Sequence, residues 1–126
     1  MPPSEPPIPG NRVVTVGIND TLVVNADRKT DVGRNDRTVV HGNQALVVDK
    51  LLSISAGEGL SVDSRKKLVI EAGDSIEFRV GDASLLLKKD GSIVLSGHDI
   101  SISGSGKINI KASGDMVLKG SKVTQN

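Results

Sequence analysis

Apolar residues return at every eighth position along most of the chain. The fourteen positions counted in steps of eight from residue 14 are all aliphatic, Thr or Phe. This column consists of Val14, Leu22, Thr30, Thr38, Leu46, Ile54, Val62, Ile70, Phe78, Leu86, Val94, Ile102, Ile110 and Leu118. A fixed short period of this length indicates a repeat protein and predicts that these residues form a core column.

Within each repeat, apolar residues alternate with polar ones, as in Ser101-Ile102-Ser103 and Lys107-Ile108-Asn109-Ile110. Alternation with period two predicts strands with one buried face and excludes amphipathic helices. Two residues after the first column, a second column holds Val or small residues, with Lys88 as the exception. Because an unpaired buried charge is costly, we expect a local bulge or a hydrated layer at Lys88.

Turn-forming residues follow the second column. Glycine recurs there, and Asn, His and Asp occupy equivalent places in other repeats. Gly and Asn accept a positive φ most readily, so each repeat is predicted to run strand, turn, strand. The predicted turn glycines are Gly17, Gly33, Gly57, Gly73, Gly81 and Gly97.

The last slot of the repeat divides the chain into regions. It is polar in the first repeats (Asp20, Arg28, Asp36 and Gln44) and later turns apolar, at Leu52, Leu60, Leu68 and Ile76 and again at Ile100, Ile108 and Met116. We therefore expect one continuous repeat domain over 13–124, with regular Val-x-Gly-x-Asn octads over 13–50, an altered middle over 51–68 and octads with a wider core over 69–124. Residues 1–12 hold all five Pro and are expected to form an extended leader or linker, and 125–126 a C-terminal tip.

Composition narrows the fold class further. Strand-favouring Val (16) and Ile (10) together outnumber Leu (11), and Phe78 is the single aromatic residue, which predicts an all-β chain with a narrow core. With no Cys there is neither a disulfide framework nor a thiolate metal site, and a net charge of +1 argues against nucleic-acid binding. No apolar run reaches the roughly 18 residues of a membrane-spanning helix, and the N-terminal residues lack a signal peptide's pattern.

An eight-residue unit cannot close a core by itself. A triangular prism needs three strands per layer, taken from one chain every 24 residues or from three chains. A single-chain solenoid usually carries a cap and distinguishes its faces, and the sequence has neither a cap helix nor a 24-residue modulation. We therefore expect an intertwined homotrimeric triple-stranded β-helix.

No residues point to catalysis or to a bound cofactor. His41 and His98 fall in different corner slots of the repeat, without converging ligands, so both are expected to be exposed turn residues rather than metal ligands. Neither Gly57-x-Gly59 nor Gly104-x-Gly106 continues into a phosphate-binding signature. The expectation is a protein that is not an enzyme, with no catalytic, cofactor-binding or metal-binding residues.

The early Val-x-Gly-x-Asn repeats and the stretch from Ala72 to Gly120 resemble the C-terminal needle of VgrG (valine-glycine repeat protein G), the spike of bacterial type VI secretion. The likeness covers nearly everything after residue 12 and is weaker over 51–68. It implies a trimeric β-helical needle that follows a larger base and a barrel domain, so Met1 is expected to start a fragment of a longer protein.

The resemblance also implies a mechanical function. Such a needle is assembled in the bacterial cytoplasm, driven outward on a secretion tube and injected through a target-cell envelope. Its expected partners are the tube protein, through the absent N-terminal domains, and a proline-alanine-alanine-arginine repeat cap or an effector at the C-terminal tip, which would supply any toxic activity. The tip residues implied are Met116, Lys119, Lys122, Val123, Thr124, Gln125 and Asn126.

Other functions share parts of this pattern. A phage tail needle or a trimeric adhesin stalk obeys the same physics, and neighbouring domains would separate these from a secretion spike. A single-chain β-solenoid enzyme or binding module would need a cleft with convergent polar groups, which a nearly uniform octad does not predict. The residues after Asp99 include four Lys and one Asp, so this end of the chain has a net positive charge. That charge could attract an acidic partner or simply keep an exposed β surface soluble.

Overall fold

A computed structural model describes residues 6–126; the first five residues of the predicted Pro-rich leader lie outside the described part. The chain divides into two units, Met1–Ile54 and Ser55–Asn126. The boundary falls inside the segment 51–68 that the sequence marks as an altered middle. Neither unit contains a helix within the described residues, in agreement with the predicted all-β character.

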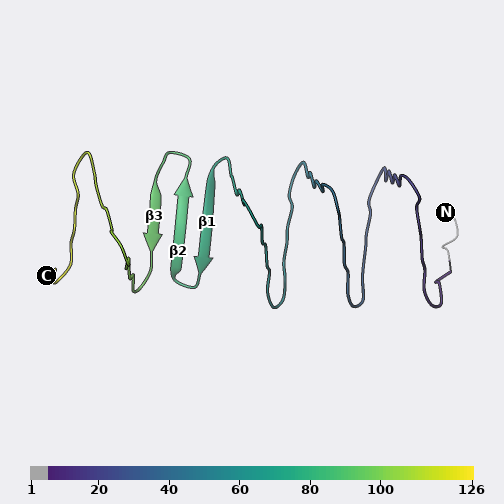
Figure 1. Cartoon of the computed structure of the whole chain (residues 1–126), viewed down its shortest axis with the longest axis horizontal. Coiled ribbons are helices and arrows are strands. Elements are labelled where there is room, and N and C mark those ends of the chain that lie inside the picture. The colour runs from purple at the N-terminus through teal and green to yellow at the C-terminus, as the bar shows by residue number, and fades with distance from the viewer. Residues whose placement is uncertain (1–5) are drawn as a thin grey trace. The chain divides into compact units, whose positions relative to one another are not determined.

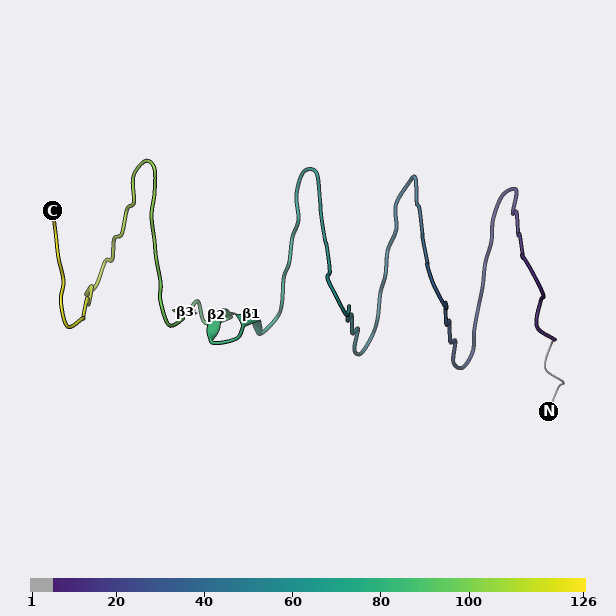
Figure 2. The same cartoon turned by 90° about the horizontal axis from the view of Figure 1, so that it is seen from below.

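The first unit consists of extended segments joined by bends at intervals of eight residues. The bends lie at 17–18, 25–26, 33–34, 41–42 and 49–50. Figures 1 and 2, which differ by a 90° turn, show that this purple-to-blue part of the chain reverses direction repeatedly in both views. Its path is therefore an open coil, and the six residues between bends form its straight segments.

The second unit continues the same spacing, with bends at 57–58, 65–66 and 73–74 and again at 105–106 and 113–114. Between these lies a sheet of three antiparallel strands in the order β1-β2-β3: β1 (Ser75–Val80), β2 (Ala83–Lys88) and β3 (Ile93–Ser96) (Figure 1). Phe78 pairs with Leu85, and Leu85 pairs with Leu95. The turns between these strands keep the eight-residue spacing, but here the strands pair with one another as hairpins.

Turn chemistry explains both hairpins. The β1–β2 loop is the pair Gly81-Asp82, and Gly81 has a φ of 53°, which fits a tight two-residue hairpin turn with Gly first. In the β2–β3 loop, Gly91 (φ 91°) donates its N–H to the Lys88 carbonyl at 3.1 Å, and the Ser92 N–H donates to Asp90 Oδ1 at 2.9 Å. Such Asx turns and positive-φ glycines favour a chain reversal.

Substitution of Gly81 by Ala is expected to destabilise the hairpin by about 1 kcal/mol, because a side chain makes the left-handed conformation unfavourable. The measurement is the denaturant midpoint of the purified protein. Gly59→Ala is the matched control, because Gly59 has no left-handed φ and a Cβ there would meet no atom within 4 Å. Equal losses in the two variants would contradict a role for the Gly81 conformation.

Burial is the unusual feature of this fold. None of the side chains at 6–126 is buried, and the chain exposes 14359 Å². A globular protein of 13.2 kDa is expected to expose about 6,400 Å². The segments in each unit therefore have the pattern of a folded repeat without the packing that would stabilise it.

Backbone pairing is equally incomplete. Apart from the sheet and three bonds next to it, the described residues form no backbone–backbone hydrogen bonds. The extended segments of both units thus leave their N–H and C=O groups available, as edge strands do. No helix among the residues at 6–126 is long and apolar enough to cross a membrane.

Candidate functional site

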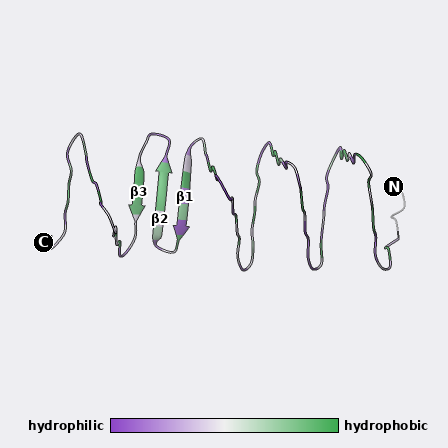
Figure 3. Cartoon of the chain, viewed as in Figure 1, coloured by the Kyte–Doolittle hydropathy of each residue, from purple (hydrophilic) through white to green (hydrophobic). Residues whose placement is uncertain are grey.

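The sheet of the second unit has one entirely apolar face. Because side chains alternate along each strand, the pairing places two cross-strand rows on this face, Ile76–Leu87–Ile93 and Phe78–Leu85–Leu95. Val80 and Ala83 extend it toward the first hairpin turn. Figure 3 colours much of β2 and β3 as hydrophobic. We call these eight residues the apolar face.

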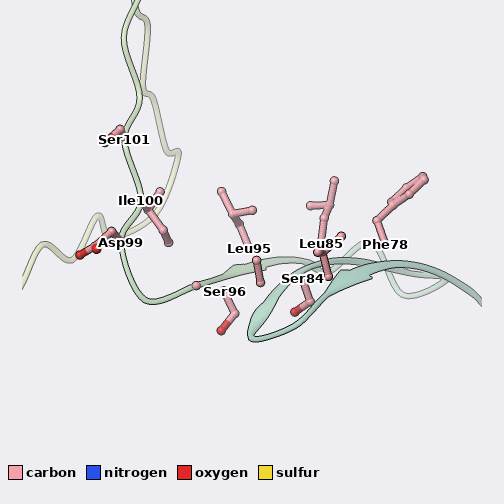
Figure 4. A pocket seen from close by; sticks show the side chains of 11 residues that line it. Phe78, Ser84, Leu85, Leu95, Ser96, Asp99, Ile100 and Ser101 are labelled. Carbon is pink, nitrogen blue, oxygen red and sulfur yellow. The ribbon is translucent and has the colours of Figure 1, made fainter. Parts of the chain in front are cut away.

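A shallow cavity of about 410 Å³ lies over this face. Figure 4 shows Phe78, Leu85 and Leu95 on the same side of the ribbon, with Ile100 at the edge, whereas Ser84 and Ser96 project from the other side. Phe78, Leu95 and Ile100 are 53%, 57% and 52% exposed, and Leu85 is half-buried. An open apolar hollow without converging polar groups is suited to cover by another protein surface rather than to catalysis.

The opposite face of the sheet carries charge. Arg79 Nε donates to Glu77 Oε1 at 2.8 Å, and the same two side chains form an ion pair. Lys88 lies on this face at the end of β2, paired with Ser75, and it is exposed. The expected bulge or hydrated layer at Lys88 is thus replaced by a hairpin end, which lets its ammonium group remain in water.

The hairpin also divides the predicted core column. Phe78 lies on the apolar face, whereas Leu86 and Val94 pair with each other on the opposite face. A two-residue loop makes Val80 the partner of Ala83, so residues eight apart in β1 and β2 fall on opposite faces. Within the sheet of this chain, Phe78 therefore lies on one face and Leu86 and Val94 on the other.

Outside the sheet, the other members of the predicted core column are exposed within this chain. Val14, Leu22, Leu46, Ile54, Val62 and Ile70 are between 61% and 71% exposed, and Ile102, Ile110 and Leu118 between 70% and 76%. The second column is more uniform, with Val16, Val24, Val32, Val40 and Val48 between 43% and 47% exposed. A repeated, half-covered valine indicates that successive repeats share one local environment.

The predicted turn glycines lie where the chain changes direction. Gly17, Gly33, Gly57 and Gly73 begin bends, Gly81 begins the first hairpin turn, and Gly97 precedes the bend at 98–99. His41 and His98 also lie at bends, and His98 Nδ1 is 3.2 Å from Asp99 Oδ2 on the exposed surface. The residues implied for the tip, 116–126 at the chain's end, are all exposed.

Charged groups gather at the second hairpin, around a cavity of about 390 Å³ lined by Asp74, Ser75, Lys88, Lys89 and Asp90. Lys89 Nζ is 3.4 Å from Asp74 Oδ1, and the Ser92 backbone N–H lowers the pKa of Asp90. These contacts stabilise the turn. Across 6–126, no group of three or more His, Asp or Glu side chains could hold a metal ion.

The apolar face includes residues that the octad columns did not identify, namely Leu85, Leu87, Ile93 and Leu95. Two local signals could have found them. Asp90-Gly91 is a turn dipeptide, and apolar residues alternate on both sides of the Gly81-Asp82 pair. Together these signals predict hairpins, which change the faces on which the later residues lie.

No protein-family model matches the chain, and a search of curated proteins found no match.

Proposed function

We propose that this chain is the needle of a secretion spike of the type VI kind: a homotrimeric, triple-stranded β-helix that breaches a target-cell envelope and carries a cap or effector at its tip. The role is structural, without a catalytic site. The absence of any buried side chain within 6–126, in a chain with a regular apolar repeat, carries this proposal. Such a repeat has to be covered by other chains.

The size of the exposed area supports an obligate assembly. The chain exposes about 8,000 Å² more than a globular protein of its mass. Obligate interfaces commonly bury 2,000–5,000 Å² or more, so an excess of this size supports intertwining over contact through one patch. The unpaired backbone of the extended segments could be satisfied in the same way, by strands of neighbouring chains.

Backbone pairing also bears on the choice between one chain and three. A single-chain solenoid bonds each strand to the next turn of the same chain, and the described segments outside the sheet form no such bonds. The open coil of each unit is compatible with partner strands from other chains. Together with the resemblance of the octads to secretion spikes, this favours a trimeric needle that is exported after cytoplasmic assembly.

Light scattering coupled to size exclusion, at two protein concentrations, tests the proposal. We expect a mass near three times 13.2 kDa at both, and a further increase when a purified proline-alanine-alanine-arginine repeat protein is added. A mass near 13.2 kDa would refute the needle. A trimer that never binds a cap would leave the assembly standing and remove the support for a capped tip.

A further inference from the structure

One column of charged residues in the first unit is not explained by the apolar repeat. It lies two residues before the first core column, and its charge alternates in sign from Arg12 to Asp36, after which the slot holds the uncharged Gln44. Its members are Arg12, Asp20, Arg28, Asp36 and Gln44. We call this set the charge column.

The charge column lies on the side of the coil that has to be covered. The bends at 17–18 and 25–26 bound one extended segment, in which Asp20, Leu22 and Val24 are two residues apart and share one side. In the next three repeats the same slot is occupied by Leu52, Leu60 and Leu68. The charged side chains thus occupy a position that becomes apolar farther along the chain.

Among the described residues 6–126, the charge column forms no ion pair within its own chain. The ion pairs of the part of the chain that the structure describes are Arg79–Glu77, Lys89–Asp74 and His98–Asp99. Arg12, Asp20, Arg28 and Asp36 take part in none of them. A charge that is covered on assembly without an opposite charge would be strongly unfavourable, so these groups need partners from elsewhere.

We propose that the charge column is an interchain ladder of ion pairs that sets the register of self-association. This inference rests on the proposed homotrimer. In three chains around a threefold axis, each chain advances one segment per third of a turn, so each segment lies beside the next segment of a neighbouring chain. Asp20 of one chain then faces Arg12 of one neighbour and Arg28 of the other, and Arg28 faces Asp36.

The ladder solves a problem that the apolar columns cannot solve. Neighbouring strands lie about 4.8 Å apart, within reach of a carboxylate and a guanidinium group. Since the valine column is nearly identical in successive repeats, sliding one chain by eight residues would preserve its apolar contacts. The same slip would bring Asp beside Asp and Arg beside Arg, which is unfavourable. Alternating charge therefore rejects the wrong register.

The test uses charge reversal in the whole chain. Arg28→Asp places a carboxylate beside Asp20 and Asp36 of the neighbouring chains in the proposed ladder. It is therefore expected to lower the apparent melting temperature by at least about 5 °C. Arg34→Asp is the matched control, because it makes the same charge change at a bend whose equivalent positions hold Ala26 and Gly42. The variant Arg12→Asp/Asp20→Arg/Arg28→Asp/Asp36→Arg restores alternation and is expected to recover the wild-type melting temperature.

Mixing provides the second measurement. Wild-type chains labelled with nitrogen-15 are refolded together with the fully reversed variant, and native mass spectrometry counts the mixed assemblies. We expect each chain to assemble with its own kind and mixed species to be depleted at least tenfold, because mixed neighbours carry like charges.

The outcomes separate the ladder from the assembly. If the wild-type protein is a trimer, two results would overturn the ladder and leave the needle intact. One is statistical mixing of the two kinds of chain, and the other is an equal melting temperature for Arg28→Asp and Arg34→Asp. A wild-type mass near 13.2 kDa would overturn both.

Discussion

Leu85→Asp is expected to abolish assembly at concentrations at which the wild-type chain is assembled. Leu85 lies at the centre of the apolar face, between Phe78 and Leu95. Full burial of a Leu side chain contributes about 1.5–3 kcal/mol, of which covering the exposed part of the half-buried Leu85 supplies a share in each chain, and an unpaired carboxylate in its place adds a desolvation cost. Because a symmetric assembly contains the change in every copy, the total loss multiplies. Light scattering on the purified variant measures it.

Leu51→Asp is the control for this experiment. Leu51 is 83% exposed, and the equivalent position three repeats earlier in the octad register already holds Asp27. The same change of residue type there should leave the assembled mass unchanged. If both variants assembled like the wild type, the apolar face would not be part of an interface.

Val40→Asp is expected to have a comparable effect in the first unit. Val40 belongs to the half-covered valine column and is 45% exposed within its own chain. We expect its remaining surface to be covered by neighbouring chains, where a carboxylate would have no partner. The expected result is loss of the assembled species, or an apparent melting temperature lower by more than about 10 °C. Size exclusion and a thermal scan at fixed protein concentration would detect either.

Val47→Asp gives the matched comparison. Val47 is 85% exposed, and the equivalent position two repeats earlier is Asp31. A carboxylate is therefore already present in this column, and the variant should behave like the wild type. If Val40→Asp and Val47→Asp lowered the amount of assembled protein or the melting temperature equally, the two sides of the segments would not differ. That result would contradict the predicted alternation of buried and exposed positions.

The charge column and the valine column have different roles in the proposed needle. Valines that repeat uniformly contribute apolar area but cannot distinguish one octad from the next. Charges whose sign alternates contribute little net stability, because desolvation offsets much of the attraction. They distinguish the registers instead, as polar residues do in coiled coils. Loss of Val40 should therefore reduce assembly itself, whereas charge reversal should change which chains assemble together.

Local features of this protein were predictable because they depend on neighbouring residues. The strand-like alternation, the absence of helices from residues 6–126 and the placement of bends near Gly17, Gly33 and Gly73 follow from period two and from turn-forming residues. Each needs only a few consecutive residues. Local sequence is therefore sufficient to specify an extended, all-β chain with a change of direction in every octad.

The faces of the sheet were decided by tertiary pairing. Counting by eight placed Phe78, Leu86 and Val94 in one column, but the two-residue loop at Gly81-Asp82 pairs Phe78 with Leu85 instead. Since side chains alternate, a difference of one residue in pairing moves a side chain to the other face of a sheet. Periodicity records which positions are apolar, whereas the register of the paired strands decides which of them meet to form the apolar face.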